Sequence, residues 1–188
     1  MVYVLIGILG YFVILLFDIL LLKKIGRIKF LLWMLGSGLM IYSIIMVCFN
    51  QDKMTLPTWT TWLGWVMFVI GAIFITYSLF INLPFRKTYI SKNTGSTLIR
   101  TGFYALCRHP GTYWVNLFMI SFIFIARSRL TLVEALVFII VNTILVIIED
   151  RYIFPKIFPD YNDYQRETPM LIPNRRSVRA YLEGMKRK

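Results

Sequence analysis

Histidine and cysteine are nearly absent from this chain, and their scarcity limits the kinds of site it can hold. Its 188 residues include one histidine, His109, and two cysteines, Cys48 and Cys107. Structural zinc sites take four ligands, mostly from Cys and His, so we expect neither a zinc site nor any other metal. The two cysteines fall on opposite sides of the membrane in the topology derived below, so a disulfide between them is not expected.

Charged residues are scarce as well. They make up 16% of the chain, whereas hydrophobic residues make up 58%. A soluble domain has about half apolar and about a quarter charged residues, so this composition predicts an integral membrane protein. Its long uncharged runs predict an all-α membrane protein, because ~20 apolar residues in a helix cross a bilayer.

Five apolar runs predict the transmembrane helices. The fourth run is short for a span, so it either forms a tight or tilted hairpin with the fifth or extends back into "RHPG". The first run lacks a basic flank before it and a small-residue cleavage site, which favours a retained helix over a signal peptide. The predicted spans are Val2–Leu22, Phe30–Phe49, Trp59–Leu83, Tyr113–Ala126 and Leu130–Ile148.

Basic residues outnumber acidic ones, 21 to 9, and their positions predict the topology. They gather after the first, third and fifth runs. Positive residues favour the cytoplasm, so we expect the N-terminus outside and the C-terminus inside a plasma (inner) membrane. The exception is "RSR" between the fourth and fifth runs, where Glu134 is expected to offset part of the charge. The net charge of +12 thus fits attraction to membrane lipids, and no nucleic-acid partner is expected.

The segment "RTGFYALCRHPGTYW", from Arg100 to Trp114, concentrates polar residues between two apolar runs. Taken alone, it is typical of a turn whose arginines contact lipid head groups and whose aromatic side chains form an interfacial belt. Pro110 disfavours helix at His109, so a helix is expected to begin just after it. The free N–H groups near Thr112 would then form an anion site.

A second polar cluster ends the fifth run. Glu149 and Asp150 lie at the C-terminal end of an apolar helix, where the helix dipole disfavours acidic side chains. A buried carboxylate needs a partner. Arg151, Arg108, His109 or a cationic ligand can supply it, so the two polar clusters are expected to meet.

Two more polar residues lie within the predicted spans. Asn142 precedes Glu149 by two helical turns and is expected to line the same cavity. Asp18 lies near the end of the first run and, as an intramembrane carboxylate, is a functional candidate. Pairing with Lys23 or Lys24 at the interface is the favoured interpretation of Asp18.

Together these residues resemble the isoprenylcysteine carboxyl methyltransferase family and its relatives, the phospholipid N-methyltransferases. The resemblance covers roughly Thr97 to Pro173. It departs from the family where two residues, in place of one, separate Pro110 from Tyr113, and where Asp150 stands in the usual place of Glu. The shared residues are Gly102-Phe103-Tyr104, Arg108-His109-Pro110, Tyr113, Glu149-Asp150, Phe158, Tyr161, Tyr164 and Ile172-Pro173.

The resemblance implies a methyltransferase that binds S-adenosyl-L-methionine in a cytoplasmic pocket formed by the C-terminal half. A lipophilic acceptor, the carboxylate, thiol or amine of a lipid or small hydrophobic molecule, would enter from the bilayer. Residues 1–83 would form three transmembrane helices, 84–173 the methyltransferase core with its helical hairpin and amphipathic cap, and 174–188 a basic tail. The implied cofactor-binding residues are Ser96, Thr97, Leu98, Ile99, Gly102, Tyr104, Arg108, His109, Pro110, Tyr113, Glu149 and Asp150.

Catalytic roles follow from the same comparison. For an amine acceptor, His109 or Glu149 would assist proton removal, while Asn142 and Arg151 would line the substrate side. Two alternatives stay open. Membrane steroid-type and sterol reductases have a similar C-terminal half and bind NADPH, although the acid pair and Gly-x-Tyr favour the methyl donor. A non-catalytic membrane protein would explain the spans but not the clustered polar residues.

Overall fold

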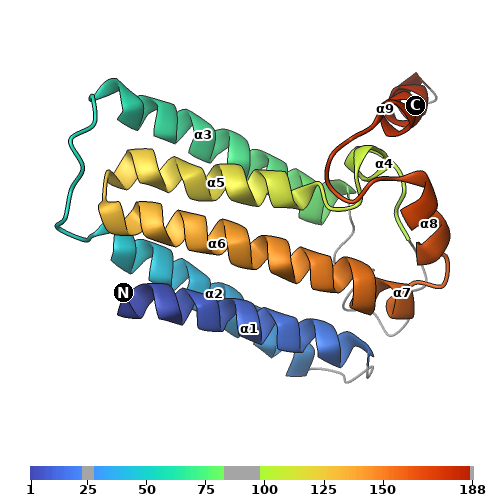
Figure 1. Cartoon of the computed structure of the whole chain (residues 1–188), viewed down its shortest axis with the longest axis horizontal. Coiled ribbons are helices and arrows are strands. Elements are labelled where there is room, and N and C mark those ends of the chain that lie inside the picture. The colour runs from blue at the N-terminus through green and yellow to red at the C-terminus, as the bar shows by residue number, and fades with distance from the viewer. Residues whose placement is uncertain (23–27, 83–97, 187–188) are drawn as a thin grey trace.

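The computed structural model describes residues 1–22, 28–82 and 98–186 of the chain. The described residues form helices and no sheet, so the prediction of an all-α integral membrane protein is confirmed. The long helices lie side by side, and short helices gather at one end of the bundle (Figure 1). Ser96, Thr97, Lys23 and Lys24, to which the sequence assigned roles, lie outside the described residues.

The first three predicted spans are helices. α1 is Val2–Leu22, α2 is Ile28–Cys48 and α3 is Trp59–Thr76. The third predicted span ran to Leu83, whereas α3 gives way to a π-helical turn, η1, over Tyr77–Asn82. Each of the three helices is apolar around its circumference, as expected for a helix that faces lipid as well as protein.

The fourth and fifth spans form an antiparallel pair. α5, Gly111–Ala126, has only 16 residues, and it begins directly after Pro110 as predicted. α6, Arg129–Ile148, continues through a π-helical turn η3, Glu149–Ile153, and α7, Phe154–Ile157. Four described helical segments are long and apolar enough to cross a membrane, and α5 is a shorter apolar helix beside them.

Glycines set the closest helix crossings. α1 packs along α2, and a Cβ atom at Gly36 would lie 2.8 Å from the carbonyl oxygen of Gly10. α3 packs along α5 in the same way, where a Cβ at Gly64 would lie 3.0 Å from the backbone nitrogen of Ile125. α6 contacts α1, α2 and α5 and so joins the two pairs. Small residues stabilise such membrane interfaces because they let backbones approach closely.

The Gly36→Ala variant is therefore expected to lower the free energy of unfolding by roughly 1–3 kcal/mol, the usual cost of overpacking. Gly38→Ala is the matched control, because a Cβ at Gly38 meets nothing within 4 Å in the described structure. Removing a helical glycine there is expected to be neutral or to stabilise by up to about 1 kcal/mol. Thermal unfolding in detergent, followed by circular dichroism, measures both. Equal melting temperatures for the two variants would contradict the close crossing.

At the end of the bundle that holds the N-terminus, the α2–α3 connection packs on the α5–α6 turn. Met54 N donates to Arg127 O at 2.6 Å, and Arg129 N donates to Asp52 O at 3.1 Å. The Arg127 guanidinium donates to the carbonyl of Leu56. Backbone acceptors and Asp52 thus accommodate "RSR". Glu134, expected to offset these arginines, is instead buried against Ser43 of α2.

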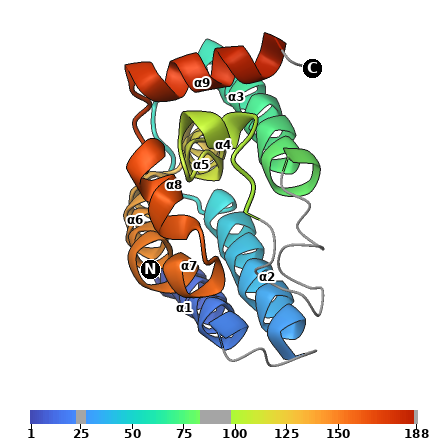
Figure 2. The same cartoon turned by 90° about the vertical axis from the view of Figure 1, so that its right-hand side faces the viewer.

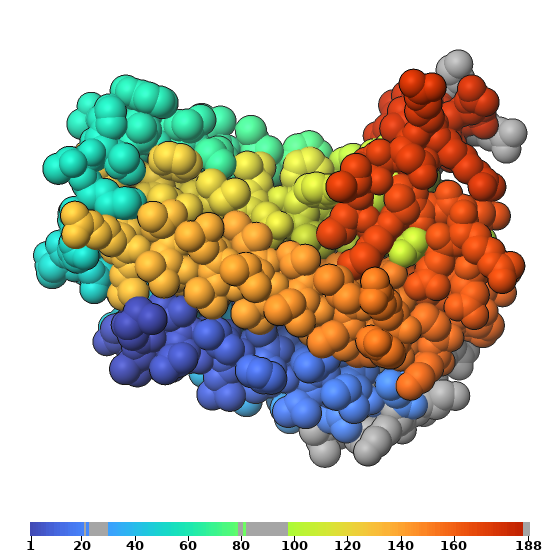
Figure 3. All heavy atoms as spheres, viewed as in Figure 1, coloured from blue at the N-terminus to red at the C-terminus, as the bar shows by residue number. Residues whose placement is uncertain are grey.

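The opposite end carries a cap of short helices. It comprises α4 (Phe103–Leu106), α7, α8 (Tyr161–Glu167) and α9 (Arg175–Lys186), which lies across the top in Figure 2. Gly102 has φ 61° and ψ −138° before α4, a backbone conformation that other residues rarely adopt. Tyr161 and Tyr164 of α8 pack into a small apolar cluster with Phe158. On the face shown in Figure 3, α9 projects from the rest of the molecule.

Candidate active site

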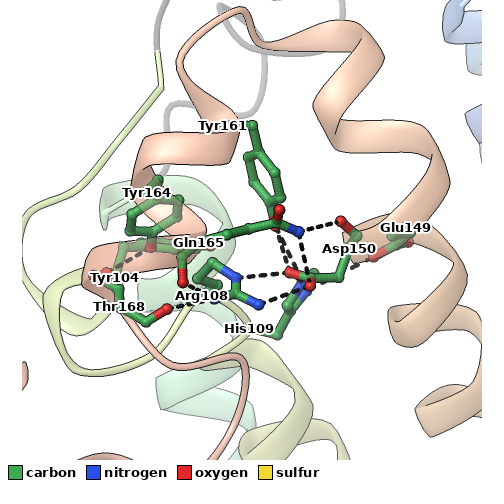
Figure 4. A network of polar contacts seen from close by, with 9 residues as sticks. All are labelled: Tyr104, Arg108, His109, Glu149, Asp150, Tyr161, Tyr164, Gln165 and Thr168. Atoms are coloured by element: carbon green, nitrogen blue, oxygen red, sulfur yellow. Dashed lines mark hydrogen bonds and ion pairs between the residues drawn. The ribbon is translucent and has the colours of Figure 1, made fainter.

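Asp150 is the centre of a buried polar network beneath the cap (Figure 4). Arg108 binds both of its carboxylate oxygens, with Nε 2.8 Å from Oδ1 and Nη2 2.7 Å from Oδ2. Tyr161 Oη donates to Oδ1 at 2.7 Å, and Gln165 Nε2 donates to Oδ2 at 3.2 Å. His109 Nε2 lies 3.1 Å from Oδ1 and carries the shared proton, because a carboxylate only accepts. Four side chains therefore satisfy this one carboxylate.

Backbone contacts bind the same network to the segment after α8. Arg108 Nη1 donates to the carbonyls of Gln165 and Thr168. The backbone nitrogens of Arg108 and His109 donate to the carbonyls of Pro169, at 2.9 Å, and Met170, at 3.2 Å. The "CRHP" turn is thus fixed between the end of α6 and the chain that leaves α8, and the Arg108 guanidinium is committed to protein acceptors.

The same contacts shift proton affinities outside the spans. Burial alone would lower the pKa of Arg108, but its hydrogen bonds and charge interaction with Asp150 raise it. Burial and then the hydrogen bond to Asp150 raise the pKa of Tyr161. Burial also raises the pKa of the Cys107 thiol to about 11. Arg108 therefore stays charged, and Tyr161 and Cys107 stay neutral, near pH 7.

A cavity of about 200 Å³ opens beside this network, between the cap and the ends of α1, α5 and α6. Its polar wall comes from both halves of the chain. The cap supplies Tyr104 and Phe154, and the spanning helices supply apolar residues together with Asp18 and Asn142. The lining residues are Ile14, Phe17, Asp18, Trp33, Ile75, Tyr104, Arg108, His109, Pro110, Gly111, Thr112, Val115, Asn142, Leu145, Val146, Glu149 and Phe154.

Glu149 presents its carboxyl group to this cavity. Its Oε2 lies 3.9 Å from His109 Nδ1, and the His109 ring stacks on Phe154 with ring centres 5.6 Å apart and planes 10° apart. The side chain of Asp18, from α1, interacts directly with Glu149. The acid pair of the sequence therefore separates: Asp150 closes the protein network, while Glu149 lines the cavity.

Six residues with predicted site roles line the cavity, and six described ones lie elsewhere. The predicted residues on the wall are Tyr104, Arg108, His109, Pro110, Asn142 and Glu149. Of the others, Tyr113 donates through its hydroxyl to Leu171 O at 2.7 Å, and Arg151 is exposed. Leu98 packs against the Phe158 cluster. Leu98, Ile99, Gly102, Tyr113, Asp150 and Arg151 are the predicted residues that the cavity lining does not include.

The expected anion site at the start of α5 is occupied by the turn itself. Thr112 N donates to His109 O and Tyr113 N donates to Pro110 O, each at 3.2 Å. The sequence interpretation also missed Gln165 and Thr168, which complete the Asp150 network but carry no motif signal. Asp18 did carry a signal, as an acid within an apolar run, although pairing with the adjacent lysines was favoured.

Metal ligands were not expected from the sequence. Within residues 1–22, 28–82 and 98–186, the structure contains no group of three or more His, Cys, Asp or Glu side chains placed to hold a metal ion.

The fold and the site define an α-helical membrane protein with a polar cavity at the capped end of its helix bundle. The chain belongs to the family described as Protein of unknown function (DUF1295), which matches residues 22–168.

Two curated proteins resemble it. The cobalt-zinc-cadmium resistance protein CzcN of Cupriavidus metallidurans is 31% identical over 115 residues, which cover 60% of this chain and 52% of that protein. The nickel-cobalt-cadmium resistance protein NccN of Alcaligenes xylosoxydans xylosoxydans is 30% identical over 115 residues, 60% of this chain and 53% of that protein. The chain thus matches about half the length of these relatives. No solved structure matches it significantly.

Proposed function

We propose that this protein is a membrane methyltransferase that binds S-adenosyl-L-methionine and acts on a lipophilic acceptor. One observation carries the proposal: the uncommitted charge on the cavity wall is acidic. Arg108 is neutralised by Asp150, whereas Glu149 and Asp18 face the cavity. Among the described residues on that wall, His109 is the one other group that can carry positive charge, and it lies between Glu149 and Asp150.

An acidic and aromatic wall suits the cofactor, which carries a sulfonium and an ammonium group. Glu149 can accept from the ammonium, and the rings of Tyr104 and Phe154 offer faces that attract cations by ~0.5–2 kcal/mol each. When bound, the cofactor supplies an activated methyl group. The chain's own residues would hold it, orient the acceptor and exclude water, and such positioning can contribute about 7–11 kcal/mol to catalysis.

The reductase alternative needs a site for the phosphates of NADPH. Phosphate binding relies on uncommitted Arg or Lys side chains, or on free N–H groups at a helix start. Arg108 donates to Asp150 and to two carbonyls, and the amides of Thr112 and Tyr113 donate within their turn. The described wall therefore favours a cationic ligand over a polyanion.

The proposed location is the plasma (inner) membrane, with the cap and cavity on the cytoplasmic side. α9 carries Arg175, Arg176 and Arg179 at the capped end, in the position where positive residues favour the cytoplasm. Its apolar residues Val178 and Leu182 are exposed on the same helix, which fits a helix lying in the lipid interface.

The decisive measurement is ligand stabilisation of the purified protein in detergent. S-Adenosyl-L-methionine and its demethylated product are expected to raise the melting temperature, since a ligand at 100 times its Kd adds ~2.7 kcal/mol. NADPH at the same concentration is expected to add nothing. Stabilisation by NADPH alone would establish the reductase instead. Stabilisation by neither would favour a non-catalytic membrane component, a reading that the resistance names of the two relatives make worth testing.

A further inference from the structure

Two buried polar atoms on the cavity wall have no hydrogen-bond partner in the described part of the chain: Asp18 Oδ2 and Asn142 Nδ2. Asp18 is 4% exposed and Asn142 9% exposed, and both line the cavity. Buried polar groups are nearly always satisfied, because leaving one without a partner opposes folding. These two come from different helices, α1 and α6, yet they lie on the same cavity. Their placement indicates a ligand that both of them contact.

The charges around the cavity specify the sign of that ligand. Among the described residues, three carboxyl groups, those of Asp18, Glu149 and Asp150, stand against one guanidinium and one imidazole. The bidentate ion pair with Arg108 balances the negative charge of Asp150. His109 can offset one further charge, so Asp18 and Glu149 side by side still leave at least one carboxyl group without a cation. A cationic group is the ligand that such a pair favours, and a carboxylate or thiolate is repelled.

The apolar lining residues specify the rest of the ligand. Ile14, Val115 and Leu145, from three spanning helices, line the same cavity as Asp18 and Asn142. Apolar walls favour an apolar body, and only a few polar groups fix its orientation. A molecule with a small cationic head and a hydrocarbon tail matches both parts of the cavity.

We propose that Asp18 and Asn142, beside Glu149, form a subsite for the ammonium group of a lipophilic amine. Asp18 accepts a hydrogen bond from the ammonium, and the amide of Asn142 meets a neighbouring polar atom of the same molecule. The assignment of this amine as the methyl acceptor rests on the proposed function, whereas its binding does not. As an acceptor, the ammonium would first pass one proton to the carboxylate of Asp18 or Glu149, so that the neutral nitrogen could take the methyl group while the cofactor left as a neutral thioether. This subsite favours an amine over a carboxylate or a thiol as the acceptor. It also gives α1, which carries Asp18, a part in substrate binding.

The test compares three eight-carbon ligands on the full-length protein in lipid nanodiscs: octylamine, octanol and octanoate. Octylamine is expected to raise the melting temperature of the wild type, and octanol and octanoate are expected to raise it much less. Equal stabilisation by octylamine and octanol would overturn the cation subsite without any variant being made. This comparison therefore remains decisive even if a substitution prevents folding.

Two variants locate the subsite. Asp18→Asn keeps the size of the side chain and is expected to weaken octylamine binding tenfold or more. Asn142→Leu is expected to leave octylamine binding unchanged but to weaken severalfold the binding of 2-aminooctan-1-ol, whose hydroxyl can accept from the Asn142 amide. Glu134→Gln is the control for Asp18, because Glu134 is also a buried carboxyl in a span but is bound to Ser43. Thr143→Ala is the control for Asn142, because Thr143 Oγ1 donates to Ile139 O on its own helix. Unchanged octylamine affinity in Asp18→Asn would place the amine elsewhere.

A competition arm separates the two sources of an ammonium group. If the subsite takes the acceptor, saturating S-adenosylhomocysteine and octylamine stabilise the protein additively. If they exclude each other, the subsite holds the ammonium of the cofactor itself and the acceptor assignment is overturned. Octylamine binding without any cofactor binding would instead overturn the proposed function and leave the cation subsite standing. The expected result is that Asp18→Asn still binds the cofactor but no longer binds octylamine.

Discussion

Asp150→Asn is expected to lower the free energy of unfolding by about 3–5 kcal/mol, the usual cost of breaking a buried ion pair from one side. The substitution keeps the shape of the side chain but removes its charge and replaces one acceptor oxygen with a donor. Arg108 would keep a buried positive charge without its bidentate partner, and Arg108 Nη2 and Gln165 Nε2, which donate to Oδ2, would face an amide donor. Because Arg108 also fixes the chain after α8, the loss is expected to loosen the cap as a whole.

The matched control is Glu167→Gln in α8. Glu167 Oε2 lies 3.5 Å from Arg100 Nη1, with side chains 52% and 34% exposed. An exposed pair of this kind contributes about 0–1 kcal/mol, so the control is expected to melt close to the wild type. Thermal unfolding in detergent measures both, and proteolysis near α8 reports loosening of the cap. A melting temperature for Asp150→Asn equal to that of Glu167→Gln would mean that the network does not hold the cap in place.

The helices were predictable because the signals for each one, a long apolar run or a proline at its start, lie within or next to its own segment of the sequence. α1 coincides with the predicted span Val2–Leu22, since an apolar run of that length, with Asp18 as its one ionisable acid, satisfies its backbone only as a helix in the bilayer. The start of α5 followed from Pro110 in the same local way. The end of α3 was not predictable, because the apolar run continues past Thr76 while the helix changes to the π-helical turn η1.

The sequence could not predict which of the two adjacent acids binds Arg108 and which one lines the cavity. Glu149 and Asp150 lie on neighbouring positions of one helix and so point in different directions. Which of them meets Arg108 depends on how α8 and the chain after it fold over the end of α6. That packing is a tertiary outcome of the contacts from Tyr161 and Gln165, and the sequence placed neither against Asp150.

For Asp18, the sequence indicated a candidate functional role but not the residue that lies beside it. Its character was visible as an acid in an apolar run, but the sequence did not indicate that Glu149 lies beside it. The structure brings it to Glu149, 131 positions along the chain, and buries it to 4% exposure. Sequence separation is a poor guide in a bundle, because helices far apart in sequence, here α1 and α6, run side by side and end at the same end.

Glu149→Gln is expected to weaken the binding of S-adenosyl-L-methionine by roughly 10–150-fold, which corresponds to the ~1.5–3 kcal/mol of a hydrogen bond to a charged group. Glutamine keeps the length of the side chain and removes the negative charge that would face the cofactor's ammonium group. The Asp150 network is untouched by this substitution, because Glu149 contributes no hydrogen bond to it among those described. The fold is therefore expected to survive, and the loss is expected in affinity.

Isothermal titration in detergent measures this affinity, and two comparisons make the result specific. Glu134→Gln changes another acid of the same helical segment, one that is bound to Ser43, and it is expected to leave the affinity unchanged. His109→Ala is expected to reduce both affinity and stability, because it removes the ring stacked on Phe154 and a hydrogen bond to Asp150. A Glu149→Gln protein that binds the cofactor as tightly as the wild type would show that the ammonium group lies away from this wall. The expected result is that Glu149→Gln loses affinity but keeps the wild-type melting temperature in the absence of ligand. That result would show that Glu149 binds the ligand, whereas its neighbour Asp150 stabilises the fold.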